Sequence, residues 1–241
     1  PGIYEVTVTD ANGCIDTDEV TIENIGGPTV DAGDDDEICA GESTSLTATT
    51  TDGTAPISIT WMPGNLSGAT ITVSPDATTT YTVTATDANG CVATDEVVVT
   101  VNPNPTVSVE DIAICAGADG TLTAVAGAGT PGYTYEWSTG ATSASITVSP
   151  GSTTSYSVTV TDSKGCTASA SATVTVNPNP TAAITGVDAT CGDDNGSATA
   201  SATGGMAPYS YEWNTGATTA MISGLTPGIY EVTETDAKGC I

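Results

Sequence analysis

The sequence predicts an all-β fold, built from tandem immunoglobulin-like (Ig-like) antiparallel β-sandwich modules in an extended array. Val, Ile and Ala dominate its hydrophobic residues, and Thr and Ser are abundant. β-branched side chains favour extended backbone. Short alternating segments are separated by Gly, Pro and Asn turns, and no segment shows helical periodicity with caps. A repeat of about 76 residues then divides the chain into modules.

The repeat is carried by tryptophans and cysteines. Trp61, Trp137 and Trp213 lie 76 residues apart, and so do Cys39, Cys115 and Cys191. A second cysteine series, Cys14, Cys91, Cys166 and Cys240, ends four related phrases: YEVTVTDANGC (4–14), YTVTATDANGC (81–91), YSVTVTDSKGC (156–166) and YEVTETDAKGC (230–240). The same landmarks therefore recur once per module.

Proline marks two module boundaries. The phrase VTVNPNPT occurs at 99–106 and again at 174–181. Asn-Pro steps remove backbone donors and keep the preceding residue extended, so these linkers should be short and stiff. The boundary at 23–29, ENIGGPT, contains glycine and should be softer. We expect the end of a truncated module at 1–25, modules at 26–102 and 103–178, and a C-terminally truncated module at 179–241.

The two ends of the chain resemble each other. Residues 1–15 and 227–241 agree at 13 of 15 positions and differ only at Val8/Glu234 and Asn12/Lys238. We expect the chain to be a fragment of a longer array. The match is consistent with an array that repeats in units of three modules.

The middle module shows how one repeat should fold. Alternating apolar and polar residues predict six strands, and Tyr133, Tyr135 and Trp137 should share one face of the third. This is the Ig-like pattern, with a single central Trp. The expected strands are Thr106–Val109, Thr121–Ala126, Tyr133–Trp137, Ser145–Val148, Ser155–Thr161 and Thr167–Val176.

The last two strands should be joined by the turn DANG, DSKG or DAKG. Asn-Gly suits the positive φ angles of a tight hairpin. Lys164 and Lys238 stand where other copies carry Asn, so both lysines are expected in turns. This argues against lysine–asparagine isopeptide cross-links, which need a lysine buried on a core strand.

Composition narrows the function. The formal net charge is −27, from 29 acidic and 2 basic residues, and histidine is absent. Such a chain repels nucleic acid and anionic membranes. No Ser-His-Asp triad is possible, and the acidic residues gather in turns and linkers rather than in a pair suited to acid–base catalysis. We therefore expect no enzyme, no nucleic-acid partner and no membrane insertion.

Calcium is the one ligand that the acidic residues favour. It takes six to eight oxygen ligands, and acidic clusters flank the softer boundary, although none follows the EF-hand spacing. The alternative is that these side chains only keep the chain soluble. The candidate ligands are Asp16, Asp18, Glu19, Asp31, Asp34, Asp35, Asp36 and Glu37.

The cysteines lack the CxxC pairs of zinc sites and predict disulfides in an oxidising compartment. Pairing within modules would join Cys39–Cys91, Cys115–Cys166 and Cys191–Cys240 and leave Cys14 over. If the first strand runs the full module length, Cys115 and Cys166 lie at opposite ends. Inter-module pairs, Cys39–Cys166 and Cys115–Cys240, would then form. A meander favours the intra-module pairs.

The third module resembles a known repeat. Its motifs are C-G-x-x-N-G-S, G-G-x-x-P-Y-x-Y-x-W and L-x-P-G-x-Y-x-V-x-x-x-D-x-x-G-C, within 191–240. These resemble the SprB-type repeat of Bacteroidetes gliding-motility adhesins. The first two modules look like related Ig-like or PKD-like modules; their turns WMPGN and WSTGA favour the Ig-like label.

The resemblance implies a type IX-secreted, very long adhesin on the cell surface, attached to the outer membrane through parts outside this segment. We therefore expect a structural and adhesive repeat segment that acts as a rod-like spacer. Two alternatives are a self-assembling extracellular filament and a glycan-binding module. The expected partners are neighbouring modules of the same chain, further copies of the chain, and external surfaces or glycans. The three Trp could stack on sugars, but their place on the third strand favours the core.

Overall fold

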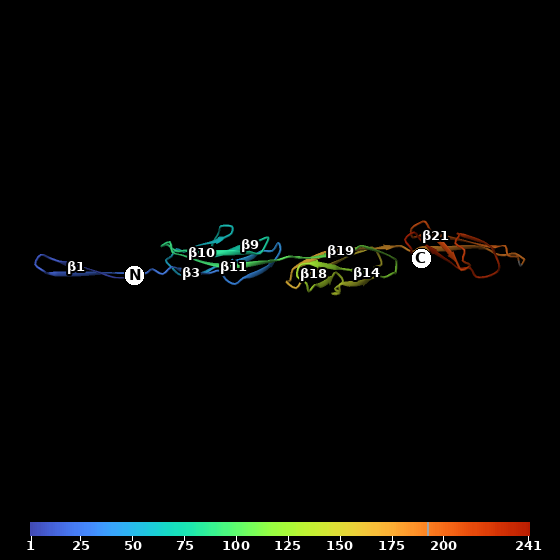
Figure 1. The fold of residues 1–241 in the computed structure, drawn as a ribbon. Helices are drawn as coiled ribbons and strands as arrows, with labels where there is room; N and C mark the ends of the chain where they lie inside the picture. The colour runs from blue at the N-terminus through green and yellow to red at the C-terminus, as the bar shows by residue number, and fades with distance from the viewer. Residues whose placement is uncertain (192) are drawn as a thin grey trace. The chain divides into compact units, whose positions relative to one another are not determined.

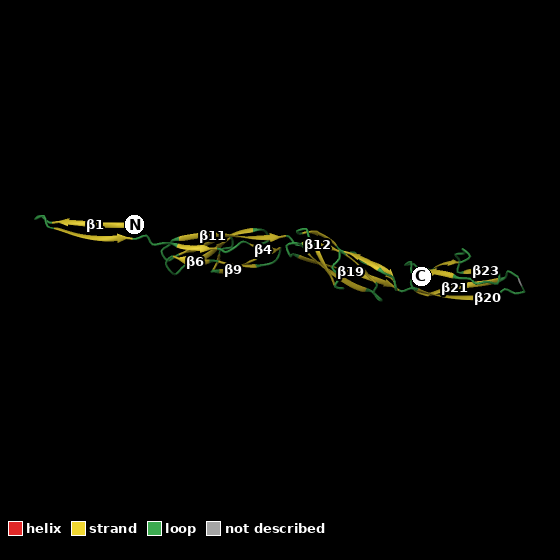
Figure 2. Cartoon of the chain, turned by 90° about the horizontal axis from the view of Figure 1, so that it is seen from below, coloured by secondary structure: helices red, strands yellow, loops and turns green. Residues whose placement is uncertain are grey.

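The computed structural model describes residues 1–191 and 193–241, and every regular element in these ranges is a β-strand (Figure 2). Within them no helix is long and apolar enough to cross a membrane. The chain divides into two compact units, Pro1–Pro103 and Asn104–Ile241. The predicted all-β, Ig-like fold class is confirmed.

The first unit begins with a two-stranded hairpin, the blue segment in Figure 1. Strand β1 (Gly2–Thr9) pairs antiparallel with β2 (Ile15–Ile22), so that Gly2 faces Ile22 and Thr9 faces Ile15. Apart from Gly2, which is half-buried, every residue of both strands is exposed.

The rest of the first unit is a β-sandwich. One sheet has five strands and is completed by two strand pairs, β3–β6 and β5–β9, whose side chains share its core. In spatial order the large sheet contains β4 (Asp36–Cys39), β11 (Val92–Asn102), β10 (Thr79–Thr86), β7 (Ser58–Met62) and β8 (Leu66–Ser67). The strand pairs are β3 (Pro28–Asp31) with β6 (Thr49–Asp52), and β5 (Thr44–Thr47) with β9 (Thr70–Val73).

The second unit opens with a sandwich of the same plan. Its four-stranded sheet has the order β13 (Ile112–Cys115), β19 (Thr167–Asn177), β18 (Thr154–Thr161) and β16 (Thr134–Trp137). Two further pairs join β12 (Pro105–Ser108) to β15 (Val125–Ala128), and β14 (Gly120–Thr123) to β17 (Ser145–Val148). The six expected strands are present, with the second split into β14 and β15, but β13 is a strand that the sequence pattern missed.

The second unit continues with a three-stranded and a two-stranded sheet. The first has the order β20 (Pro180–Val187), β21 (Gly196–Gly204) and β23 (Met221–Leu225), and the second pairs β22 (Ser210–Trp213) with β24 (Val232–Thr235). The described residues form three separate hydrophobic cores, drawn from residues 30–101, 107–176 and 198–232.

Each core is centred on a tryptophan, as the sequence predicts. Trp61, Trp137 and Trp213 are 0%, 2% and 2% exposed. Each indole Nε1 donates a hydrogen bond to a backbone carbonyl, that of Gly68 at 3.0 Å, Ser143 at 2.8 Å and Thr219 at 2.9 Å respectively. The buried N–H is therefore satisfied, and no indole face is available to stack on a sugar.

The short strands β4 and β13 decide where the first cysteine series lies. Each pairs in parallel with the end of its module's last strand, so that Cys39 faces Asn102 and Cys115 faces Asn177. An aspartate precedes each one: Asp35 accepts a hydrogen bond from Val98 N (2.8 Å) and Asp111 from Thr173 N (2.7 Å). The chain is thus attached to the last strand just before β4 or β13 begins.

Candidate functional site: the cysteine turns and the inter-module disulfide

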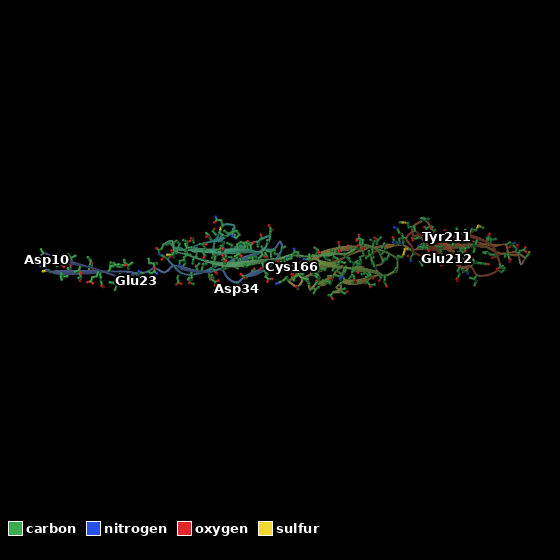
Figure 3. The ribbon with its side chains drawn as sticks, viewed as in Figure 1. Asp10, Glu23, Asp34, Cys166, Tyr211 and Glu212 are labelled. Carbon is green, nitrogen blue, oxygen red and sulfur yellow. A yellow bond between two sulfur atoms is a disulfide. The ribbon has the colours of Figure 1, made fainter. Side chains whose placement is uncertain are left out.

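The recurring Asp-x-x-Gly-Cys turn is built in the same way in all four copies. In the first, Asp10 N donates to Cys14 O (2.9 Å) and Gly13 N to Asp10 O (3.0 Å), while Asp10 Oδ1 accepts from the N–H groups of Asn12 (2.8 Å) and Cys14 (2.9 Å). Asp10 lies at the tip of the hairpin (Figure 3). The other three turns, at 87–91, 162–166 and 236–240, have equivalent bonds.

Only the glycine of each turn has a positive φ, between 80° and 85°. The sequence interpretation, which gave Asn-Gly two positive φ angles, is corrected on this point. A type I turn followed by a left-handed glycine leaves the preceding position unrestricted. This explains why Asn and Lys alternate there. Both lysines are exposed in these turns, as predicted.

A second set of hydrogen bonds attaches three of these turns to their own module. The other carboxylate oxygen, Oδ2, accepts from a backbone N–H in the loop before the Trp strand: Asp87 from Thr54 (3.0 Å), Asp162 from Thr130 (2.8 Å) and Asp236 from Met206 (2.8 Å). The residue after each aspartate donates back to the carbonyl of the same loop residue. Each turn cysteine is therefore held in a defined place.

The aspartates that hold these turns are charged as well as buried. Asp87, Asp162 and Asp236 are 4–5% exposed. The hydrogen bond from Thr54 N is the main cause that lowers the pKa of Asp87, and the bond from Thr130 N does the same for Asp162. At Asp236 burial alone would raise the pKa, but bonds from Cys240, Met206 and Lys238 N–H groups outweigh it and the pKa is lowered.

A disulfide joins the second module to the third. Cys115, at the end of β13, bonds to the turn cysteine Cys240, with Cα atoms 5.5 Å apart. Two hydrogen bonds hold the linker beside it: Ala116 N donates to Asn177 O (2.8 Å), and Asn179 Nδ2 donates to Ala116 O (3.2 Å). Both asparagines of the NPNP linker thus contact the residue after Cys115, and the joint combines covalent and polar contacts.

This disulfide corrects the favoured intra-module pairing. Cys91 and Cys191 are free thiols, so neither Cys39–Cys91 nor Cys191–Cys240 forms, and Cys115–Cys166 is excluded because Cys115 bonds to Cys240. Cys166 precedes β19 and Cys115 faces its last residue, Asn177. A strand of 11 residues spans roughly 36 Å, which no disulfide bridges.

The remaining cysteines differ in state. Cys39 and Cys166 are disulfide-bonded, and Cys166 is 1% exposed. Cys14 is free and exposed. The odd thiol expected from the sequence is therefore not alone, since Cys91 and Cys191 are free too.

The structure does not gather the calcium candidates. Asp16, Asp18 and Glu19 are exposed on β2. In residues 1–191 and 193–241 no group of three or more carboxylate or cysteine side chains could hold a metal ion. Calcium binding stays a prediction from composition.

The acidic residues around β4 have structural partners instead. Asp31 accepts from Gly33 N (2.8 Å), Asp36 from Glu37 N (2.8 Å) and the Thr44 hydroxyl, and Glu37 from Asn102 Nδ2 (3.2 Å). Asp35 bonds to Val98 N as described above, and Asp34 is exposed. These side chains therefore hold the crossover between β3 and β4. The signal that the sequence interpretation missed is the aspartate that precedes β4 and β13, 76 residues apart.

The fold and its joint define a class of protein: a chain of tandem Ig-like modules in which the second and third are tied by a disulfide. Two segments, residues 106–142 and 183–218, match the model of the SprB repeat. The resemblance to this family is confirmed for the third module and extends to the second, which the sequence motifs had placed among the related Ig-like modules. The chain is thus similar to the SprB repeat over these two segments, which together cover less than half of its length.

One known structure supports the fold. The N-terminal eight Ig domains of Down Syndrome Cell Adhesion Molecule superpose with a TM-score of 0.52 at 18% identity, over 95% of this chain and 33% of that one. The chain therefore spans about a third of that structure's length. A titin fragment, I67–I69, is similar with a TM-score of 0.44 and 15% identity, over 89% of this chain and 95% of that one. No curated protein matches the sequence.

Proposed function

We propose that this chain is a structural and adhesive repeat segment of a long gliding-motility-type adhesin, which acts as a rod-like spacer and surface-contact element. The observation that carries the proposal is the Cys115–Cys240 disulfide, because it fastens one Ig-like module to the next. A covalent bond to the neighbour also fixes the spacing of the two modules, which a spacer needs and an isolated binding domain does not.

The polar construction of the joint supports the same role. The turn that presents Cys240 is attached to its own module through Asp236, and Asn177 and Asn179 of the linker bond to Ala116, the residue after β13. Bending at this joint would break the two hydrogen bonds at Ala116, each of which contributes roughly 1 kcal/mol. Stiff joints suit a spacer.

The proposal places the protein outside the cell. Disulfides persist in oxidising compartments, and the SprB repeat is the basis for proposing type IX secretion by a member of the Bacteroidetes and outer-membrane attachment through other parts of the protein. Its partners are then neighbouring modules and the surfaces that the cell contacts. The net charge of −27 keeps such a chain soluble and away from anionic lipid and nucleic acid.

Two alternative functions compete with the role of a spacer. A glycan-binding module loses its aromatic platform, because all three Trp are buried. A self-assembling filament would need regular contacts between chains.

Labelling of intact cells tests the proposal. Antibodies against residues 104–241 should label unpermeabilised cells of the producing bacterium on single thin threads in electron micrographs. Their Fab fragments should reduce attachment to glass, whereas Fab fragments against an unrelated surface protein should not. Labelling only after permeabilisation would refute the surface role, and regular multi-chain fibres would favour the filament.

A further inference from the structure

The seven cysteines fall into two positions, and the Cys115–Cys240 bond relates them. One position ends the short strands β4 and β13, at Cys39 and Cys115, and the 76-residue repeat assigns Cys191 to it. The other closes the Asp-x-x-Gly-Cys turn (Cys14, Cys91, Cys166, Cys240). In the observed bond, the strand cysteine of the second module takes the turn cysteine of the third. We call this the forward pairing.

The other cysteines differ in state. Cys39 and Cys166 are disulfide-bonded, whereas Cys14, Cys91 and Cys191 are free. In the forward pairing, Cys191 would take the turn cysteine of another module, and Cys91 would take a strand cysteine of another module.

We infer that Cys191 and Cys91 are the two halves of a further inter-module disulfide, in which Cys191 bonds to the turn cysteine of another module of this kind. Cys191 is exposed, as such a role requires. The repeat match between residues 1–15 and 227–241 sets the register: a module that followed in this register would present the equivalent of Cys91 to Cys191.

The geometry at Cys91 supports this assignment. Its turn has the same hydrogen bonds as the turns of Cys166 and Cys240: Asp87 Oδ1 accepts from Cys91 N at 2.8 Å, and Asp87 Oδ2 from Thr54 N at 3.0 Å. Cys91 is therefore held as its bonded counterparts are, yet it is only half-buried, whereas Cys166 and Cys240 are 1% and 0% exposed. A second sulfur beside it would complete the burial.

The linker before β3 makes the proposed Cys91 disulfide more important for its joint than the Cys115–Cys240 disulfide is for the joint between the second and third modules. Gly27, before β3, stands where Asn179 stands before β20, and glycine has no side-chain amide to donate to the preceding module. A Cβ on Gly27 would approach the Cβ of Cys91 to 3.2 Å, so glycine also keeps space beside the thiol. The Cys91 joint would depend on its disulfide rather than on a linker amide.

The chemistry is thiol–disulfide exchange. One cysteine thiolate attacks an external disulfide, such as oxidised glutathione, and forms a mixed disulfide. The second thiolate displaces the remaining thiol, so the protein loses two protons and two electrons and the external disulfide becomes two thiols.

A tandem chain tests the inference. Residues 1–241 followed directly by residues 16–241 continue the repeat in register, and the chain is oxidised with glutathione, digested without reduction and analysed by mass spectrometry. We expect a peptide that links Cys191 of the first copy to Cys91 of the second. The substitution Cys91→Ser in the second copy alone should leave Cys191 of the first copy open to alkylation. The control substitution Cys14→Ser should leave that Cys191 protected.

The Cys115–Cys240 peptide, present in every variant, reports correct folding. An alkylated Cys191 in the first copy of the parent tandem, or its bond to anything but a turn cysteine, would overturn the inference. The same oxidation of separate 241-residue chains at increasing concentration shows whether the partner cysteine belongs to the same chain or to another one. A Cys191 bond to a turn cysteine of a second copy indicates cross-linking between chains. Its absence restricts the bond to contiguous modules.

Discussion

At the residue scale, the third module carries a buried carboxylate where the other copies carry an apolar side chain. Glu234 is 4% exposed, and neither carboxylate oxygen has a hydrogen-bond partner among the described residues. Ala85 and Val160, two residues before the turn aspartate like Glu234, are 0% exposed. On the neighbouring strand Tyr211, labelled in Figure 3, faces Glu234 in register. Burial raises the pKa of Glu234 above its ordinary value of 4.5.

Glu234→Val should stabilise the third module at pH 7 by roughly 1–3 kcal/mol, the cost of an unsatisfied buried polar group. Because the folded-state pKa is raised, the wild-type chain is most stable below the ordinary pKa and loses stability as the pH rises through the folded value. The gain should therefore shrink as the pH falls through the folded value and be smallest below about pH 4.5. Thermal melting of both chains from pH 3 to pH 8 measures it, and a gain that is constant with pH would contradict the assignment. Glu212→Gln, an exposed change on β22, should have no effect.

The turn aspartates predict the opposite pH dependence. Asp162→Asn should lower the melting temperature of the second module by a few degrees at pH 7, since an amide nitrogen replaces one acceptor oxygen. The wild-type pKa is lowered, so its contribution is present above the ordinary value of 3.8 and is lost as the pH falls through the folded value. The difference between the chains should vanish in acid. Asp119→Asn, at an exposed site, is the control, and an equal effect there would argue against a special role for Asp162.

At the scale of elements, the first two sandwiches are each held by a Trp strand and by a short strand, β4 or β13, that runs parallel to the last one. Strand β16 places Trp137 among Val158, Val160 and Val174, all 0% exposed. Strand β13 adds Ile114 to the same core and leaves Cys115 at the module end. The Trp strand was predictable, because alternation over Tyr133, Tyr135 and Trp137 is visible in the sequence. Four residues such as IAIC carry too little alternation to reveal a parallel strand.

Trp137→Ala should destabilise the second module by about 3–5 kcal/mol, as for other large core truncations. Chemical denaturation measures the loss, and Glu136→Ala, exposed on the same strand, should stay within about 0.5 kcal/mol. Sugars should leave the fluorescence of the wild-type chain unchanged. If the Trp137→Ala variant is stable and loses binding on a glycan array, the indole stacks on a sugar instead of filling the core.

At the scale of the second unit, the Cys115–Cys240 bond changes what the third module can do when it unfolds. The third module is attached to the second at two points: its first residues through the linker, and Cys240 through the disulfide. An unfolded third module is thus a closed loop of roughly 60 residues, which costs about 4 kcal/mol of chain entropy. An inter-module bond therefore stabilises one module nearly as much as the expected intra-module bond would.

The double change Cys115→Ser with Cys240→Ser should lower the unfolding free energy of the third module by roughly 4 kcal/mol and leave the first module unchanged. Hydrogen exchange read by mass spectrometry assigns the loss to each module. Cys14→Ser, at an exposed free thiol, is the matched control. Equal losses in the first and third modules would mean that the bond does not act locally.

The all-β class, the repeat, the buried tryptophans and the cysteine turns could be predicted from the sequence, because these depend on composition and on spacing along the chain. The partner of each cysteine was decided only by the tertiary structure. Whether Cys115 meets Cys166 or Cys240 depends on which end of β19 it lies beside, and strand β13, held by Asp111, places it at the end next to the third module. The same holds for the acidic residues: their abundance predicted calcium, whereas in the folded chain several accept backbone hydrogen bonds that hold β4, β13 and the turns in place.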